Sequence, residues 1–196
     1  MSLVPQFDAS NKWDGQILDL LSCIDFLVLS ESEAFNISRS NTSTPAALEG
    51  RTDCEATTKL EREPNTNSQT LQLFASFFNE KGLNRLFIIV TMGDRGAAVL
   101  RGGKILFTNP ASKVDVVVDP TGAGDAFAAG FIYGYLRSRE HNTRILDEDY
   151  CNDGKEEEYV RNGLKWGNAL GAACVKCVGA SSPCSQEDIT CALSKV

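Results

Sequence analysis

The segment 116–127 constrains the fold of this chain more than any other stretch of its sequence. Three valines lead into the turn Asp119-Pro120-Thr121-Gly122-Ala123-Gly124-Asp125, and an apolar run from Ala126 to Leu136 follows. Because β-branched residues favour strands and the apolar run is long enough for a helix, this order predicts a strand, a loop and a helix. Gly122 and Gly124 permit backbone angles and close approach that a Cβ would prevent. They stand where the first helical amides lack acceptors, so the loop is a candidate site for an anion such as a phosphate.

Asp125 needs an explanation of its own, because a carboxylate beside an anion site repels the anion. One interpretation is a general base that accepts the proton of a hydroxyl while that hydroxyl attacks a bound phosphoryl group. The other is an acidic residue that caps the helix, which requires no ligand. The spacing alone leaves both interpretations open.

The order of residues from Asp119 to Asp125, followed by Phe127 and Gly130, resembles the signature near the C-terminus of the PfkB (ribokinase-like) carbohydrate kinases. In that family the Gly-Ala-Gly amides form an anion hole and the final Asp is the catalytic base. The resemblance implies these roles for Gly122, Ala123, Gly124 and Asp125, and so favours the general base over the cap.

Composition places further bounds on the protein. The chain has 196 residues, 42% hydrophobic and 23% charged, which predicts one soluble globular domain over residues 1–196. No apolar run is long enough to cross a bilayer, and residues 1–10 lack the features of a signal peptide. We therefore expect a cytoplasmic protein. The formal net charge of −7 argues against nucleic acid as a partner, and no membrane partner is expected.

The cysteines and the single histidine argue against a disulfide scaffold, a zinc knuckle and a histidine-dependent catalytic triad. Seven cysteines without a secretory signal indicate reduced thiols rather than a disulfide scaffold. Cys174 and Cys177 have the spacing of a zinc knuckle, but they lie in an apolar helical run, and Cys184 and Cys191 do not make a second knuckle. His141 is the single histidine, so triads that depend on histidine have little to build on.

Residues 7–13 resemble the point about midway through a PfkB kinase at which a strand ends in an Asp-containing turn. The resemblance implies that the substrate-binding and lid portion, which precedes this point in the family, is missing. The implied fold is the remainder of a ribokinase-like three-layer α/β sandwich with a mostly parallel sheet. An uncovered sheet edge attracts partners, which predicts a homo-oligomer or contact with the missing N-terminal half.

The run 24–29 predicts a buried parallel strand, and Ser30 and Glu33 follow it. These two residues fit a capping box, which stabilises a helix start without any ligand. The family has an Asn-x-x-Glu motif here whose Glu helps to organise Mg²⁺, and Glu33 matches it, although Ser30 replaces the Asn. The resemblance therefore implies that Glu33 is a metal residue, beside the phosphates and waters that Mg²⁺ usually keeps.

Residues 86–91 predict a second buried strand, which ends in Thr91, with Gly93 and Gly96 after it. A Gly-x-x-Gly turn is weak evidence by itself, because hairpins use glycine in the same way. The resemblance adds more, since the family has a Thr-x-Gly-x-x-Gly segment here that contacts nucleotide phosphates. It implies nucleotide binding by these three residues.

Asn168 and the loop 179–183 also resemble functional positions of the family. Asn168 corresponds to a position that lines the adenine pocket, and a helix-surface amide is the alternative. The loop resembles the one that encloses K⁺ together with the Asp and Thr of the signature, here Asp119 and Thr121. It is one residue shorter than in ribokinase, so no ligand within it is assigned.

The other elements are predicted from period and composition. They are a hairpin over 97–107, a strand over 114–118 and helices over 71–82 and 159–178. A short last helix over 185–194 is capped by Ser185 and Asp188, and two polar insertions cover 38–68 and 138–158.

These features together predict a C-terminal nucleotide-binding and catalytic part of a PfkB-type kinase. It would transfer phosphate from ATP to a hydroxyl of a sugar or sugar-like alcohol, with Mg²⁺ and K⁺ as cofactors and a sugar or nucleoside as substrate. The competing prediction is a non-catalytic nucleotide-binding or partner-binding fragment of a kinase, because the substrate half is missing. A vitamin kinase of the same superfamily resembles the signature less closely. The acceptor alcohol is not indicated by any motif.

Overall fold

The computed structural model describes residues 1–5, 13, 16–41, 64–143, 153–179 and 185–194. The chain divides into two compact units. The first unit is Met1–Val90 with Ala98–Phe107, and the second unit is Thr91–Ala97 with Thr108–Val196. The centres of both predicted insertions, 42–63 and 144–152, lie outside the described residues.

The sheet has five strands in the order β1-β2-β3-β4-β5: β1 Ser2–Leu3, β2 Phe26–Ser30, β3 Phe87–Thr91, β4 Ala97–Arg101 and β5 Lys104–Asn109. β1 pairs in parallel with β2, with Ser2 opposite Phe26 and Leu3 opposite Leu27. Short turns join β3 to β4 and β4 to β5, and connections of this length pair strands in antiparallel hairpins. The predicted hairpin over 97–107 and the two predicted buried strands are confirmed.

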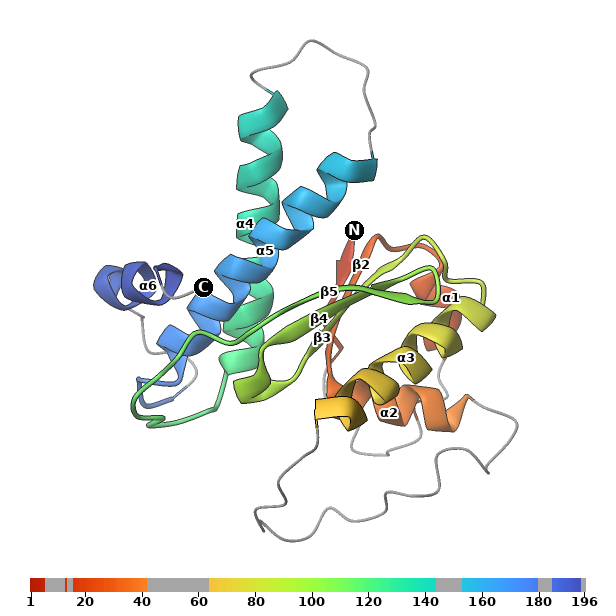
Figure 1. The fold of residues 1–196 in the computed structure, drawn as a ribbon, viewed down its shortest axis with the longest axis horizontal. Coiled ribbons are helices and arrows are strands. Elements are labelled where there is room, and N and C mark those ends of the chain that lie inside the picture. Colours follow the sequence, from red (N-terminus) through yellow and green to blue (C-terminus); the bar gives the residue numbers. More distant parts are fainter. Residues whose placement is uncertain (6–12, 14–15, 42–63, 144–152, 180–184, 195–196) are drawn as a thin grey trace, which may run out of the picture. The chain divides into compact units, whose positions relative to one another are not determined.

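Three helices belong to the first unit: α1 Ile17–Leu21, α2 Glu31–Ser40 and α3 Pro64–Glu80. α2 and α3 pack side by side (Figure 1). The apolar side of α3 buries Phe74 and Phe78, each 1% exposed. α3 ends as predicted at Gly82, whose φ is +79°, and the Leu83 amide donates to Phe78 O at 3.0 Å. A glycine in the left-handed region with this hydrogen bond is a common helix stop.

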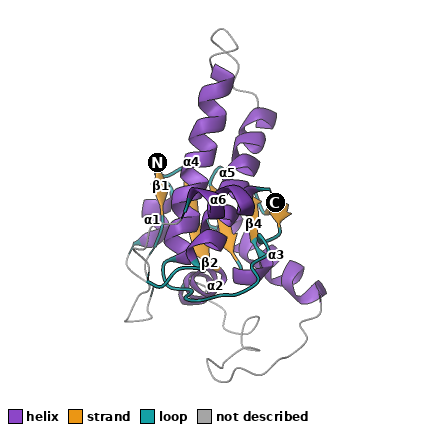
Figure 2. Cartoon of the chain, turned by 90° about the vertical axis from the view of Figure 1, so that its left-hand side faces the viewer, coloured by secondary structure: helices purple, strands orange, loops and turns teal. Residues whose placement is uncertain are grey.

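The second unit is built on two long helices, α4 Ala123–Thr143 and α5 Asp153–Cys174, followed by α6 Gln186–Leu193. α4 and α5 lie side by side (Figures 1 and 2). Ser185 accepts a hydrogen bond from the Asp188 amide at 3.0 Å, which confirms the predicted cap of the last helix. In the part of the chain that the structure describes, no helix is long and apolar enough to cross a membrane.

Two predictions about this unit were wrong. The loop predicted over 138–158 is shorter, because α4 continues to Thr143 and α5 begins at Asp153. A charged stretch need not be a loop, because Arg, Lys and Glu are good helix formers and an exposed helix face accepts them. The strand predicted over 114–118 does not form. Val116, Val117 and Val118 are instead 67, 59 and 52% exposed, because β-branched residues favour strands only where neighbouring strands offer a surface to pack on.

Candidate active site

The carboxylate of Asp119 holds the loop of the signature. Its Oδ1 accepts a hydrogen bond from the Thr121 amide at 2.9 Å, and its Oδ2 accepts one from the Gly179 amide at 2.9 Å. The amides of Val118 and Asp119 both donate to the carbonyl of Val175, at 2.7 and 3.2 Å. The loop before α4 is thus fastened to the segment after α5.

These contacts lower the pKa of Asp119 below its ordinary value of 3.8; the side chain of Thr121 is the largest cause, and the amides of Thr121 and Gly179 come next. A carboxyl whose pKa is lower in the folded state stabilises the fold above its unfolded pKa, and this stabilisation is lost as the pH falls through the folded pKa.

We expect Asp119→Asn to lower the free energy of unfolding at neutral pH and expect that loss to shrink below pH 3.8. Urea denaturation of wild type and variant at about pH 7 and about pH 3 measures the change. Asp115→Asn, which alters an exposed carboxylate of the same segment, is the matched control. An equal loss from Asp119→Asn at both pH values would contradict the assignment.

The amides at the start of α4 fall into two groups. Ala123 donates its amide to Pro120 O at 3.2 Å, and Ala126 donates to Gly122 O at 2.9 Å. Among the described residues, no backbone carbonyl accepts from the amides of Gly122 or Gly124, as is usual for the first amides of a helix. Gly122 has a φ of +80°, in the left-handed region that glycine adopts without strain.

Gly124 is not required by the packing of the chain itself. A Cβ at this position would meet no atom within 4 Å, and its φ is not in the left-handed region. A glycine within a helix costs roughly 0.5–1 kcal/mol relative to alanine. The missing side chain leaves open space beside Gly124, and the exposed Asp125 is the next residue. This arrangement can admit an anion and exchange a proton beside it.

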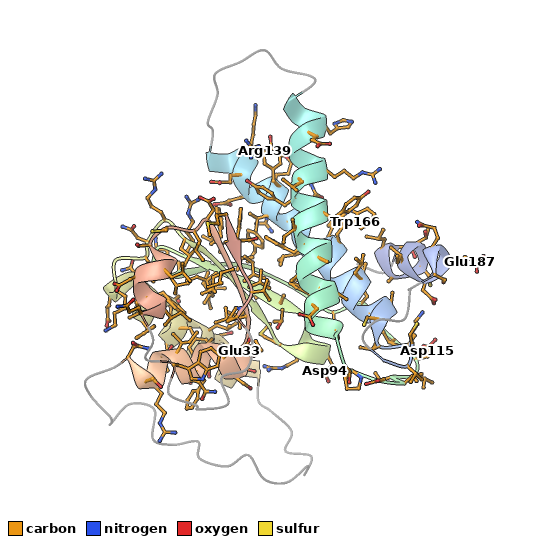
Figure 3. The ribbon with its side chains drawn as sticks, turned by 180° about the vertical axis from the view of Figure 1, so that it is seen from behind. Glu33, Asp94, Asp115, Arg139, Trp166 and Glu187 are labelled. Atoms are coloured by element: carbon orange, nitrogen blue, oxygen red, sulfur yellow. The ribbon has the colours of Figure 1, made fainter. Side chains whose placement is uncertain are left out.

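Glycines fix the direction of α4 by close contact with α5. A Cβ at Gly130 would lie 2.6 Å from the carbonyl oxygen of Trp166, and one at Gly134 would lie 2.6 Å from Cδ1 of the Trp166 ring. Figure 3 shows Trp166 beside α4. From the other helix, a Cβ at Gly163 would lie 2.8 Å from the ring of Phe131. Because neither helix can rotate without a clash, the start of α4 keeps one orientation relative to α5.

The turn predicted to contact nucleotide phosphates joins β3 to β4 and contains the 3₁₀ turn η2, Gly93–Arg95. The Met92 amide donates to Gly96 O at 2.8 Å, which closes the turn after Thr91. Gly93 has a φ of +61°, and Gly96 has a φ of +92° with a ψ of −137°. Only glycine adopts the second pair of angles readily.

Asn168 is buried, with 6% of its surface exposed, so it is not a helix-surface amide. Its Nδ2 donates to the carbonyl oxygens of Asn109 and Pro110, at 3.4 and 3.0 Å. The side chain thereby ties α5 to the end of β5 and to Pro110, which follows it. Its role at an adenine stays a prediction.

Cys174, the last residue of α5, also contacts the signature loop. Its Sγ donates to the carbonyl oxygen of Thr121 at 3.7 Å. Burial raises the pKa of the Cys174 thiol, and Cys177, Asp119 and Asp125 raise it further by their negative charge. The thiol therefore keeps its proton and acts as a donor to the loop.

Glu33 lies in the first unit, near the start of α2 (Figure 3). Its Oε2 accepts from the amide and the hydroxyl of Ser30, at 2.6 and 2.8 Å, and the Ser30 hydroxyl accepts from the Glu33 amide at 3.2 Å. The predicted capping box is confirmed. The Mg²⁺ role of Glu33 stays a prediction.

Within the second unit, the predicted site residues form two groups. One is the signature, Asp119 to Asp125, with 175–179 beside it, and the other is the turn 91–96 with Asn168 connected through 109–110. Of the predicted K⁺ loop only Gly179 is described, since 180–183 lie outside the described residues. No three His, Cys, Asp or Glu side chains of the described residues are grouped as a metal site.

The sequence matches the pfkB family of carbohydrate kinases over residues 2–188. The chain belongs to this family. Among curated PfkB relatives, the cytidine kinase of Thermococcus kodakarensis is 41% identical over 58 residues, which are 30% of this chain and 21% of that protein.

Solved structures support the ribokinase-like α/β fold of this PfkB chain. The fructokinase of Vibrio cholerae O395, in a form with fructose, ADP and calcium bound, superposes with a TM-score of 0.61 at 19% identity, over 98% of this chain and 50% of that one. The nucleoside kinase of Methanocaldococcus jannaschii gives a TM-score of 0.57 at 19% identity, over 100% of this chain and 48% of that one. The chain thus spans about half the length of these solved relatives.

Proposed function

We propose that this chain is the nucleotide-binding and catalytic part of a PfkB kinase that transfers the γ-phosphate of ATP to a hydroxyl of a sugar, a nucleoside or a similar alcohol. The observation that carries the proposal is the start of α4. There, the amides of Gly122 and Gly124 have no backbone acceptor among the described residues, a Cβ on Gly124 would meet open space, and the exposed carboxylate of Asp125 follows.

The proposed chemistry follows from what these groups can do. Asp125 accepts the proton of the attacking hydroxyl, so that positive charge does not build up on its oxygen as that oxygen bonds to the γ-phosphorus and ADP leaves. The amides of Gly122 and Gly124 donate to the phosphoryl oxygens on which charge accumulates. The Ala123 amide joins them when its bond to Pro120 O is released. The positive end of α4 acts in the same direction. The carboxylate thus acts on the attacking hydroxyl and the amides act on the phosphoryl group. This division explains why a carboxylate lies beside an anion site.

The other predicted residues have supporting roles in this proposal. Thr91, Gly93 and Gly96 bind the nucleotide phosphates, and Asn168 is connected to their turn through the backbone of Asn109 and Pro110. Glu33 contributes to Mg²⁺ binding, and its Oε2 already accepts two hydrogen bonds from Ser30, which suits contact through a water. Mg²⁺, when bound, would neutralise charge on the phosphates.

Asp119 and Thr121 are the proposed K⁺ residues. The two carboxylate oxygens of Asp119 offer about four acceptor positions. Two accept the amides of Thr121 and Gly179 and one accepts the Thr121 side chain, which leaves room for a cation.

A second candidate function is nucleotide binding without turnover. It is supported by the exposed valines Val116 to Val118, which another polypeptide could cover. In this version catalysis requires an N-terminal half or a second copy of the chain.

Calorimetry with ATP and Mg²⁺, followed by ATP turnover assays with a panel of sugars and nucleosides, separates the candidates. We expect ATP to bind, and turnover that depends on one acceptor would establish the kinase. ATP binding without ATP turnover in the presence of any of the sugars or nucleosides would favour the second candidate. A chain that does not bind ATP at all would contradict both.

A further inference from the structure

The amide nitrogen of Asn168 already has acceptors within the chain. An amide NH₂ group has two donor hydrogens, and Asn168 Nδ2 has two acceptors, the carbonyl oxygens of Asn109 at 3.4 Å and Pro110 at 3.0 Å. The side chain is 6% exposed, so its hydrogen bonds are shielded from water. Donation to a nucleotide base would require the loss of at least one of these bonds.

The segment 109–111, to which Asn168 is bonded, is in close contact with the turn 92–96, which we call the phosphate turn because of its proposed role. A Cβ on Gly96 would lie 2.1 Å from Asn109 O and 2.6 Å from both Pro110 C and Ala111 N. The backbone of 109–111 therefore packs directly against Gly96, which closes the turn through the Met92 amide. Any displacement of 109–111 changes the support of this turn.

The same side of α5 also reaches the signature. Gly171 lies three residues after Asn168, a spacing that places two residues on one helix face. A Cβ on Gly171 would be 3.4 Å from Ala123 O, at the first residue of α4. One face of α5 thus braces the signature helix directly and the phosphate turn through Asn168.

We propose that Asn168 is a positioning residue for phosphate binding: through 109–111 it fixes the turn 92–96, and its NH₂ group holds the chain instead of donating to the base. This inference rests on the proposed function, because it assigns the turn to the nucleotide phosphates. It differs from an adenine contact in a measurable way, since a positioning residue affects every ligand that has the same phosphates.

The test compares Mg²⁺-ATP with inorganic tripolyphosphate, each titrated into the 196-residue chain. Asn168→Asp keeps the size of the side chain but replaces the donor with a carboxylate that faces two carbonyl oxygens. We expect the Kd of both ligands to rise by a similar factor of about tenfold, as for the loss of a buried hydrogen bond. A rise for ATP alone, or for neither ligand, would overturn the proposal.

Asn162→Asp is the matched control. Asn162 lies on the same helix, and its Nδ2 donates to Ser138 Oγ at 3.0 Å, so this change also removes a bond between α5 and α4. We expect it to leave both Kd values unchanged. Wild type that binds neither ligand would count against the proposed function itself, which distinguishes the two failures.

Hydrogen exchange provides a readout that does not depend on ligand. In Asn168→Ala, a variant without added charge, we expect faster exchange of the Met92 and Gly96 amides while the amides in the middle of α4 are unchanged. Exchange at the turn equal to that of wild type would overturn the proposal even where Asn168→Asp does not fold.

Discussion

Asp125→Asn is expected to lower the rate of phosphoryl transfer by about 10²–10⁴-fold, the usual contribution of a general base. The Kd of Mg²⁺-ATP should change little, because the amide side chain has nearly the same size and the backbone amides proposed to bind the phosphate are not altered. Asp125 is exposed at the start of α4, so the substitution should also leave the free energy of unfolding nearly unchanged. The rate is measured with wild type that turns over, either the 196-residue chain or a longer polypeptide that carries it.

Asp115→Asn is the control for this experiment, because it removes one negative charge from the loop that leads to the signature. The labelled Asp115 appears toward the end of α4 at which that helix begins (Figure 3). If loss of charge alone altered the rate, both variants would slow the reaction. Turnover retained by Asp125→Asn would instead favour the helix cap, the interpretation that the spacing of the residues had left open.

Local signals in the sequence predicted much of the fold and part of the site. Ser30 and Glu33 form the capping box that their spacing indicates, and Gly82 ends α3, because both depend on hydrogen bonds within one turn of helix. Gly122 has the positive φ that its place in the loop suggested. These features are set by residues close in sequence, which is why the pattern was sufficient.

Long-range contacts were not predictable in the same way. The bond between Asp119 and the Gly179 amide joins residues 60 positions apart, and Asn168 reaches Pro110 across 58 positions. No periodicity marks such pairs. An Asp two residues before Thr121 did carry a signal that could have been used, since Asp side chains often accept from the amide two residues on.

Gly93 and Gly96 show how one motif contains two different requirements. Both glycines have a positive φ, and the sequence treats them alike. In the structure a Cβ at Gly93 would meet no atom within 4 Å, whereas one at Gly96 would overlap the backbone of Asn109, Pro110 and Ala111. The first glycine is needed for its backbone angle alone. The second is needed for its angle and for the space that it leaves.

Gly96→Ala should therefore be far more damaging than Gly93→Ala. For Gly93→Ala we expect a loss of about 1–2 kcal/mol in the free energy of unfolding, the cost of a left-handed residue that has a Cβ. For Gly96→Ala, strain of about 1–3 kcal/mol adds to overpacking of about 1–3 kcal/mol, because backbone atoms cannot move aside as a side chain can. Chemical denaturation of the two variants measures the difference.

The same pair of variants tests whether the turn is coupled to nucleotide binding. Displacement of 109–111 by the new methyl group would break the close fit beneath the turn, so Gly96→Ala should also weaken the binding of Mg²⁺-ATP and of tripolyphosphate together. Gly93→Ala, with open space around its Cβ, reports how much of that loss comes from the backbone angle. Equal losses of stability and affinity in both variants would mean that the contact of Gly96 with 109–111 contributes nothing, and would remove the link between Asn168 and the phosphate turn.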